Sequence, residues 1–265
     1  MTGALIAALA AIFLWWFSTG VILLAVRRAD KSGRHLATVI AGLPLLCGGG
    51  WAVALSLDMA TLGGVYLGFL GALAIWGWIE LAFLAGVVTG PMRQDCLPGL
   101  SGKKRFFRAF ATVAHHELLL TSGLLGLVLL SHGAENRIAM ATYLILYLAR
   151  IFAKLNLFYG VPRINMEFVP DRLLHLKTYF RRGPVTLAFP VAITALTALL
   201  AVCVERLWFA GTDVSVVGYG LLTALAALAL LEHWLMVIPL PDAKLWRWML
   251  PPQHPGPKIM TKEER

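Results

Sequence analysis

Ionisable side chains lie inside several apolar stretches of this 265-residue chain. A charge at the centre of a bilayer costs at least ~2.5–3.5 kcal/mol on insertion scales, so such residues usually pair with one another or serve a function. Eight residues are of this kind: Glu80, His115, His116, Glu117, Arg150, Lys154, Glu232 and His233. Carboxylates, imidazoles and cations at this depth could form ion pairs, coordinate a metal centre or transfer protons.

The spacing of these residues places several of them on shared helix faces. Four polar residues at 4-3-4 spacing form one stripe that must face protein: Tyr143, Tyr147, Arg150 and Lys154. Trp76 lies one helical turn before Glu80 and shares its face. The triplet at 115–117 covers about 200° of arc at 100° per residue, so its members cannot all face one groove. We therefore expect at least one of them to meet a different neighbour or a second chain.

Seven apolar stretches are long enough to cross a bilayer, and they must be helical because hydrocarbon offers no partner for backbone polar groups. They are 3–26, 36–57, 61–88, 109–131, 138–160, 185–208 and 214–238. The chain is 59% hydrophobic and 14% charged, whereas a soluble domain carries about 25% charged residues. We therefore predict an all-α polytopic membrane protein. Residues 1–238 form a single seven-helix transmembrane domain, and 239–265 form a cytoplasmic interfacial segment and loose tail.

Lysine and arginine are distributed unevenly between the loops, and this predicts the orientation of the chain. The loops after the first, third and fifth stretches, and the tail, each hold four or five of these residues, whereas the other loops hold at most one. The basic loops and the C-terminus are therefore expected in the cytoplasm and the N-terminus in the periplasm. Because the net charge of +9 comes from these loops, we expect a lipid bilayer as partner and no nucleic acid.

The ionisable residues fall in one layer on four helices, roughly 8–15 Å below the cytoplasmic surface at 1.5 Å per residue. Glu80, Glu117 and Glu232 oppose Arg150 and Lys154, which leaves one negative charge if the histidines are neutral. Three roles stay open for this layer, and they do not exclude one another. It could be a network that holds the bundle together, a catalytic or proton-relay site, or a ligand pocket in which His116 or His233 coordinates a metal centre.

Several enzyme classes lack their motifs in this sequence. The histidine boxes of membrane di-iron enzymes, HExxH, the Walker A loop, GxSxG and DDxxD are all absent. A retinal protein would need a lysine in the last stretch, and 214–238 contains none. Two further stretches, 168–182 and 240–252, are predicted as helices on the cytoplasmic membrane surface.

Four ordered blocks of the chain, 71–91, 105–120, 149–162 and 168–182, are similar to a known family. Over residues 60–190 the sequence resembles the photosynthetic complex assembly protein 2 family, the PuhE-type proteins of phototrophic bacteria. The positions that match its motifs include Trp76, Trp78, Glu80, His116, Glu117, Arg150, Lys154, Asn156 and Pro162. The family assigns no role to these residues.

The resemblance implies a multi-pass protein of the bacterial inner (intracytoplasmic, or chromatophore) membrane. Such a protein would assist assembly of the reaction-centre and light-harvesting complex, whose subunits would be its partners. No enzymatic activity or cofactor is established for the family, so we expect an assembly factor rather than an enzyme.

Under this hypothesis bacteriochlorophyll or a precursor could lie between the helices. His116 or His233 would lie near its magnesium, and Trp76 or Trp78 would pack on the ring. The alternative is an intramembrane enzyme or transporter acting on a lipid-like or isoprenoid pigment precursor. In that case Glu80, His116 and Glu117 would perform acid–base chemistry.

Overall fold

The computed structural model describes residues 2–240, and the regular secondary structure of this part is helical. Its elements are α1 (Thr2–Ser32), α2 (His35–Ala41), α3 (Leu43–Ser56), α4 (Leu62–Leu84), α5 (Gly102–Leu130), α6 (Ile138–Tyr159), the 3₁₀ helices η1 (Met166–Phe168) and η2 (Asp171–Tyr179), α7 (Ala188–Trp208) and α8 (Asp213–Leu235). With α2 and α3 counted together, seven helices of the described residues are long and apolar enough to cross a membrane. The prediction of an all-α fold with seven such helices is confirmed.

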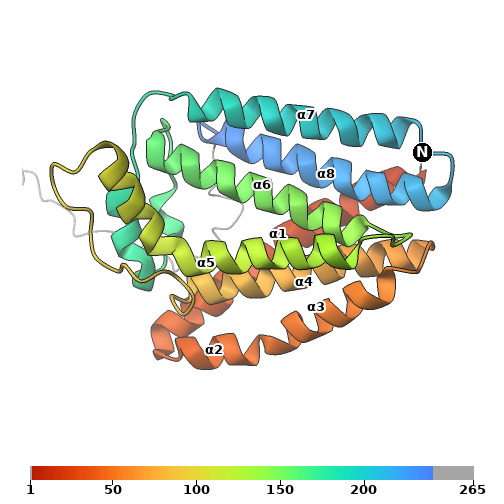
Figure 1. The fold of residues 1–265 in the computed structure, drawn as a ribbon, viewed down its shortest axis with the longest axis horizontal. Helices are drawn as coiled ribbons and strands as arrows, with labels where there is room; N and C mark the ends of the chain where they lie inside the picture. Colours follow the sequence, from red (N-terminus) through yellow and green to blue (C-terminus); the bar gives the residue numbers. More distant parts are fainter. Residues whose placement is uncertain (1, 241–265) are drawn as a thin grey trace, which may run out of the picture.

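The helices form one bundle in which successive spans run in opposite directions (Figure 1). We call one end the basic end, because it holds the lysine- and arginine-rich segments 27–34, 93–108 and 163–182; the other is the far end. Half of the apolar window of α4 and of α8 is buried inside the bundle, against 17–28% for the other spans. These two helices are therefore the centre around which the others pack.

Several spans differ from their predicted bounds, among them α5, which begins at Gly102 rather than residue 109. Three of the differences have local reasons. The second span is broken at Gly42, because Pro44 lacks an N–H and its ring blocks a continuous helix. The third ends at Leu84 rather than residue 88, since Gly86 adopts a φ of +68° that stops the helix. By contrast, α1 continues to Ser32, where Gly33 with a φ of +69° terminates it.

The segment after α6 forms a cap over the basic end of the bundle, and it differs from the surface α-helix predicted at 168–182. Its helix η2 has three residues per turn, so the buried side chains recur every third position: Leu173, Leu176 and Tyr179. Leu173 and Leu176 pack against Phe83 of α4. We call residues 161–182 the cap. The other predicted surface helix, 240–252, lies outside the described residues except for Leu240.

The broken second span packs closely on α4. A Cβ atom placed on Gly49 would lie 2.8 Å from the carbonyl oxygen of Gly71, so these two backbones approach each other without room for a side chain. Nearer the basic end, the indole N–H of Trp78 donates a 3.1 Å hydrogen bond to the carbonyl of Val39. This fixes α2 against α4 and orients Trp78 towards the second span.

Candidate functional site

A cavity of about 1480 Å³ lies between α1, α4, α5, α6 and α8, and residues of the cap line it as well. Small-molecule sites typically measure ~300–1,000 Å³, so this cavity has room for a large ligand. Most of its lining is aliphatic or aromatic, including Trp15 and Trp16 of α1. The lining includes exposed side chains on three helices, Ile12 of α1, Phe110 and Leu118 of α5, and Leu231 of α8, so the cavity reaches the surface of the bundle.

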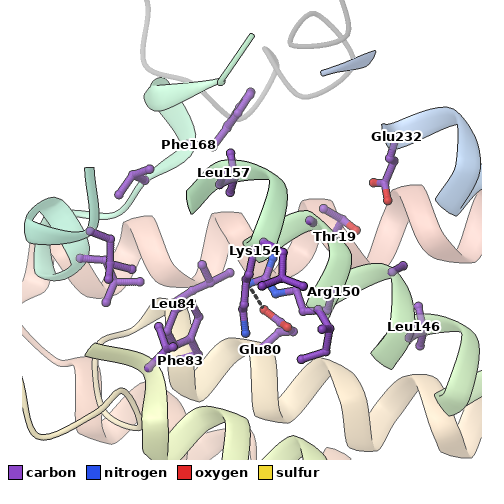
Figure 2. Close-up of a pocket in the computed structure, with 18 of the residues that line it drawn as sticks. Thr19, Glu80, Phe83, Leu84, Leu146, Arg150, Lys154, Leu157, Phe168 and Glu232 are labelled. Atoms are coloured by element: carbon purple, nitrogen blue, oxygen red, sulfur yellow. Dashed lines mark hydrogen bonds and ion pairs between the residues drawn. The ribbon is translucent and has the colours of Figure 1, made fainter. Parts of the chain in front are cut away.

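Two ion pairs form the polar part of the cavity wall (Figure 2). Arg150 donates a 2.8 Å hydrogen bond from Nη2 to Oε2 of Glu80, and Lys154 forms an ion pair with Glu117. The guanidinium of Arg150 and the ammonium of Lys154 lie 5.7 Å and 5.5 Å from the ring centre of Phe83. These contacts join α6 to α4 and to α5 within a few ångströms of one aromatic ring.

Each residue of the polar stripe of α6 has a partner on a neighbouring helix. Nearer the far end, the hydroxyl of Tyr143 donates to the carbonyl of Leu120 at 3.1 Å, and that of Tyr147 lies 3.0 Å from the hydroxyl of Thr121. Both partners belong to α5. The stripe therefore continues the attachment of α5 to α6 that Lys154 begins.

The two predicted tryptophans lie on different sides of α4. Trp76 lines the cavity, and its ring meets the edge of Tyr143 with centroids 5.1 Å apart. Trp78 is not among the lining residues and is held by its hydrogen bond to Val39. The structure thus brings Trp76, but not Trp78, to the cavity.

The histidine pair of α5 divides between two environments. His115 is exposed and lines the cavity. His116 is fully buried, stacked on Phe83 at 4.2 Å, with Nε2 3.7 Å from Oε1 of Glu80. Within the described part of the chain, neither ring nitrogen of His116 has a hydrogen-bond partner. His116 lies behind the ring of Phe83 rather than on the cavity surface.

The neighbouring residues Glu232 and His233 bring α8 to the cavity. His233 is 1% exposed, and its Nδ1 lies 2.7 Å from the carbonyl oxygen of Ala229. This bond places the ring proton on Nδ1 and leaves Nε2 as an acceptor, which has no partner among the described residues. Glu232 is half-buried and lines the cavity, apart from the ion pairs (Figure 2).

Asn156 lies on α6 and is fully buried. Neither atom of its amide group has a hydrogen-bond partner in residues 2–240. It is not among the residues that line the cavity.

The described residues contain no group of three or more His, Cys, Asp or Glu side chains arranged to hold a metal ion.

Two arginines at the start of α5 tie the cap to the bundle, a role that sequence reasoning missed. Arg105 donates to the carbonyls of Phe158 (3.2 Å) and Tyr179 (2.6 Å), and Arg108 donates to the Tyr179 hydroxyl at 3.1 Å. In the sequence, both arginines contribute only to the number of basic residues in their loop. Their spacing of three residues, which places them on one face of a helix, could have indicated a shared partner.

His175 lies in the cap, where its surroundings favour the uncharged form of the imidazole. Burial lowers the pKa of this imidazole below its usual value, Asp95 opposes the change and Arg93 adds to it. The cap therefore adds no positive charge at this position near pH 7.

Comparison with known proteins gives one family and one close relative. The family model described as "Protein of unknown function (DUF3623)" matches residues 1–256. The chain is 50% identical over 253 residues to an uncharacterized 30.4 kDa protein in the puhA 5′ region of Rhodobacter capsulatus, covering 95% of this chain and 92% of that protein. No solved structure matches.

The ion pair between Arg150 and Glu80 yields a stability prediction. Arg150→Leu leaves a buried carboxylate without its partner, so we expect a loss of about 3–5 kcal/mol in unfolding free energy, measured by thermal unfolding in detergent. The double variant Glu80→Leu/Arg150→Leu should recover most of that loss. Arg206→Leu, an exposed residue near the far end of α7, is the control and should change little. A double variant as unstable as the single one would contradict this account.

Proposed function

The chain belongs to the DUF3623 family, and we propose that it is a membrane assembly factor for the bacterial reaction-centre and light-harvesting complex that holds bacteriochlorophyll or a precursor in its cavity. The observation that carries the proposal is the cavity of about 1480 Å³, walled by apolar and aromatic side chains at the level of the ion pairs. An assembly factor must hold an apolar pigment away from water and release it into a membrane complex. A cavity that reaches the surface of the bundle suits both tasks.

The position of the related gene supports the photosynthetic part of the proposal. The relative from Rhodobacter capsulatus lies in the puhA 5′ region. This location agrees with the resemblance of residues 60–190 to the PuhE-type proteins. A photosynthetic partner is therefore favoured over an unrelated membrane complex.

The residues at the cavity fit a magnesium-containing pigment. A histidine that binds a metal commonly donates its other ring N–H to a backbone carbonyl, and His233 does so to Ala229. Its Nε2 lone pair is then directed away from that carbonyl and has no partner among the described residues. Trp76 of α4 offers an aromatic side chain in the lining of the same cavity. When bound, the pigment would supply the light-absorbing ring and its central magnesium.

The chain's own residues would bind and orient the pigment. The pairs Arg150–Glu80 and Lys154–Glu117 hold α4, α5 and α6 at fixed separations, so the cavity keeps its width. The cap excludes water from the basic end through Leu173 and other apolar residues. His116, behind Phe83, would support this wall rather than contact the ligand.

The alternative of an intramembrane enzyme or transporter has less support from the geometry. Acid–base chemistry would need Glu80, His116 or Glu117 to meet a substrate. Both carboxylates are paired with cations, and His116 has no exposed surface. These observations favour holding a ligand over converting it.

We also propose that the protein lies in the inner (intracytoplasmic) membrane with its basic end in the cytoplasm, as the loop charges predict. Alkaline phosphatase fused within residues 132–136, at the far end, should be active, because that enzyme folds only in an oxidising compartment. The same reporter within residues 94–100 should be inactive. Reversed activities would contradict the proposed orientation.

Pigment binding is tested on the full-length protein purified from pigmented membranes. We expect bacteriochlorophyll or a precursor to copurify at a fixed ratio to protein. Leu146→Trp fills part of the cavity and should remove most of the pigment, as should His233→Ala. Leu129→Trp, on the exposed face of α5, is the matched control and should leave it unchanged. A colourless wild-type preparation, or a wild-type ratio of pigment to protein in Leu146→Trp, would contradict the proposal.

A further inference from the structure

The cavity wall carries one carboxylate without a direct partner. In the described part of the chain, Glu80 and Glu117 are each paired with a cation, whereas Glu232 makes no ion pair or hydrogen bond. Glu232 is half-buried and lines the cavity. Glu232 of α8 is therefore the acid that the sequence predicts to be in excess over the cations of this layer.

The groups around Glu232 do not neutralise it. Arg150 attracts it electrostatically, but the guanidinium donates its hydrogen bond to Glu80 instead. Lys154 is held by Glu117, and His233 points its Nδ1 at the backbone of its own helix. Figure 2 shows Glu232 standing apart from the cluster of Glu80, Arg150 and Lys154.

A carboxylate in such a place favours an electropositive centre in the ligand. Charged groups inside the membrane are costly without compensation, and a partner delivered by the ligand removes this cost on binding. Carboxylate oxygens form their strongest hydrogen bonds with cationic donors, and they also suit hard cations such as Mg²⁺.

We propose that Glu232 is the residue that recognises the ligand in this cavity, and that the ligand presents to it an electropositive centre attached to a large apolar body. The centre is either a protonated amine head or the magnesium of a tetrapyrrole. The apolar body packs on the wall formed by Trp15, Trp76 and Leu146. This inference rests on the proposed function in that it uses the same cavity, but it assigns the recognition to Glu232.

Two pairs of probes test the recognition, with binding measured by quenching of the fluorescence of the cavity tryptophans in full-length protein. The first pair is dodecylamine and dodecanoate, which share a chain length and differ in head charge. The second is bacteriochlorophyll and its magnesium-free form. In at least one pair the wild type should prefer the member with the electropositive centre by about tenfold or more: dodecylamine over dodecanoate, or bacteriochlorophyll over its magnesium-free form. Dodecanoate and the magnesium-free pigment offer Glu232 no cationic partner.

Substitution of Glu232 should abolish this preference. In Glu232→Gln the amine preference should fall to near unity, and in Glu232→Leu the magnesium preference should fall as well, because leucine has no oxygen ligand. Dodecanoate and the magnesium-free pigment should bind these variants at least as well as wild type. Glu205→Gln, an exposed acid of α7, is the control and should keep the wild-type preference.

The outcomes separate the two sources and the two proposals. Preference in the amine pair alone identifies a cationic head, and preference in the pigment pair alone identifies a metal centre. No preference in either pair, or a preference that survives both Glu232 substitutions, overturns the inference. If neither pigment binds, the proposed function fails, and the amine pair still decides the role of Glu232.

Discussion

The need to compensate charge inside an apolar bundle organises this structure. Arg150 and Lys154 lie on one face of α6, and their acids come from two other helices, Glu80 from α4 and Glu117 from α5. Since breaking a buried pair leaves an uncompensated charge, the three helices are held in one relative arrangement. Phe83 lies beside both cations and has His116 stacked on it, so the wall of the cavity is built around this ring.

In this arrangement a network of ion pairs and a cavity share the same helices. The ion pairs join α6 to α4 and α5, and these three helices surround the cavity together with α1 and α8. The charged side chains of these pairs are compensated by one another, so polar contacts to a ligand would come from other residues. Glu232 and His233 are the groups of α8 that can supply them, which explains why the proposals for ligand binding converge on this helix.

Helical spacing predicted much of the site, because a spacing of 4-3-4 on α6 fixes one face whatever the tertiary structure. The same reasoning indicated that residues 115–117 must diverge. It could not tell which histidine faces the cavity, since that depends on the rotation of α5, which the contacts of Lys154, Tyr143 and Tyr147 with α5 determine. In the cap, three residues per turn and 3.6 residues per turn fit the same sequence, and the 3₁₀ form is the one that packs Leu173 and Leu176 against Phe83. Trp15 and Trp16 were not distinguished, because α1 is apolar on every side.

The central claim is that the cavity beside the ion pairs is a ligand site. The most direct test is an electron cryo-microscopy structure of the full chain isolated from photosynthetically grown membranes in lipid nanodiscs. The account predicts density for one large ligand in contact with Trp76 and Glu232, with the pairs Arg150–Glu80 and Lys154–Glu117 intact. A cavity closed by movement of α5 onto α1, with no space for a ligand, would contradict it.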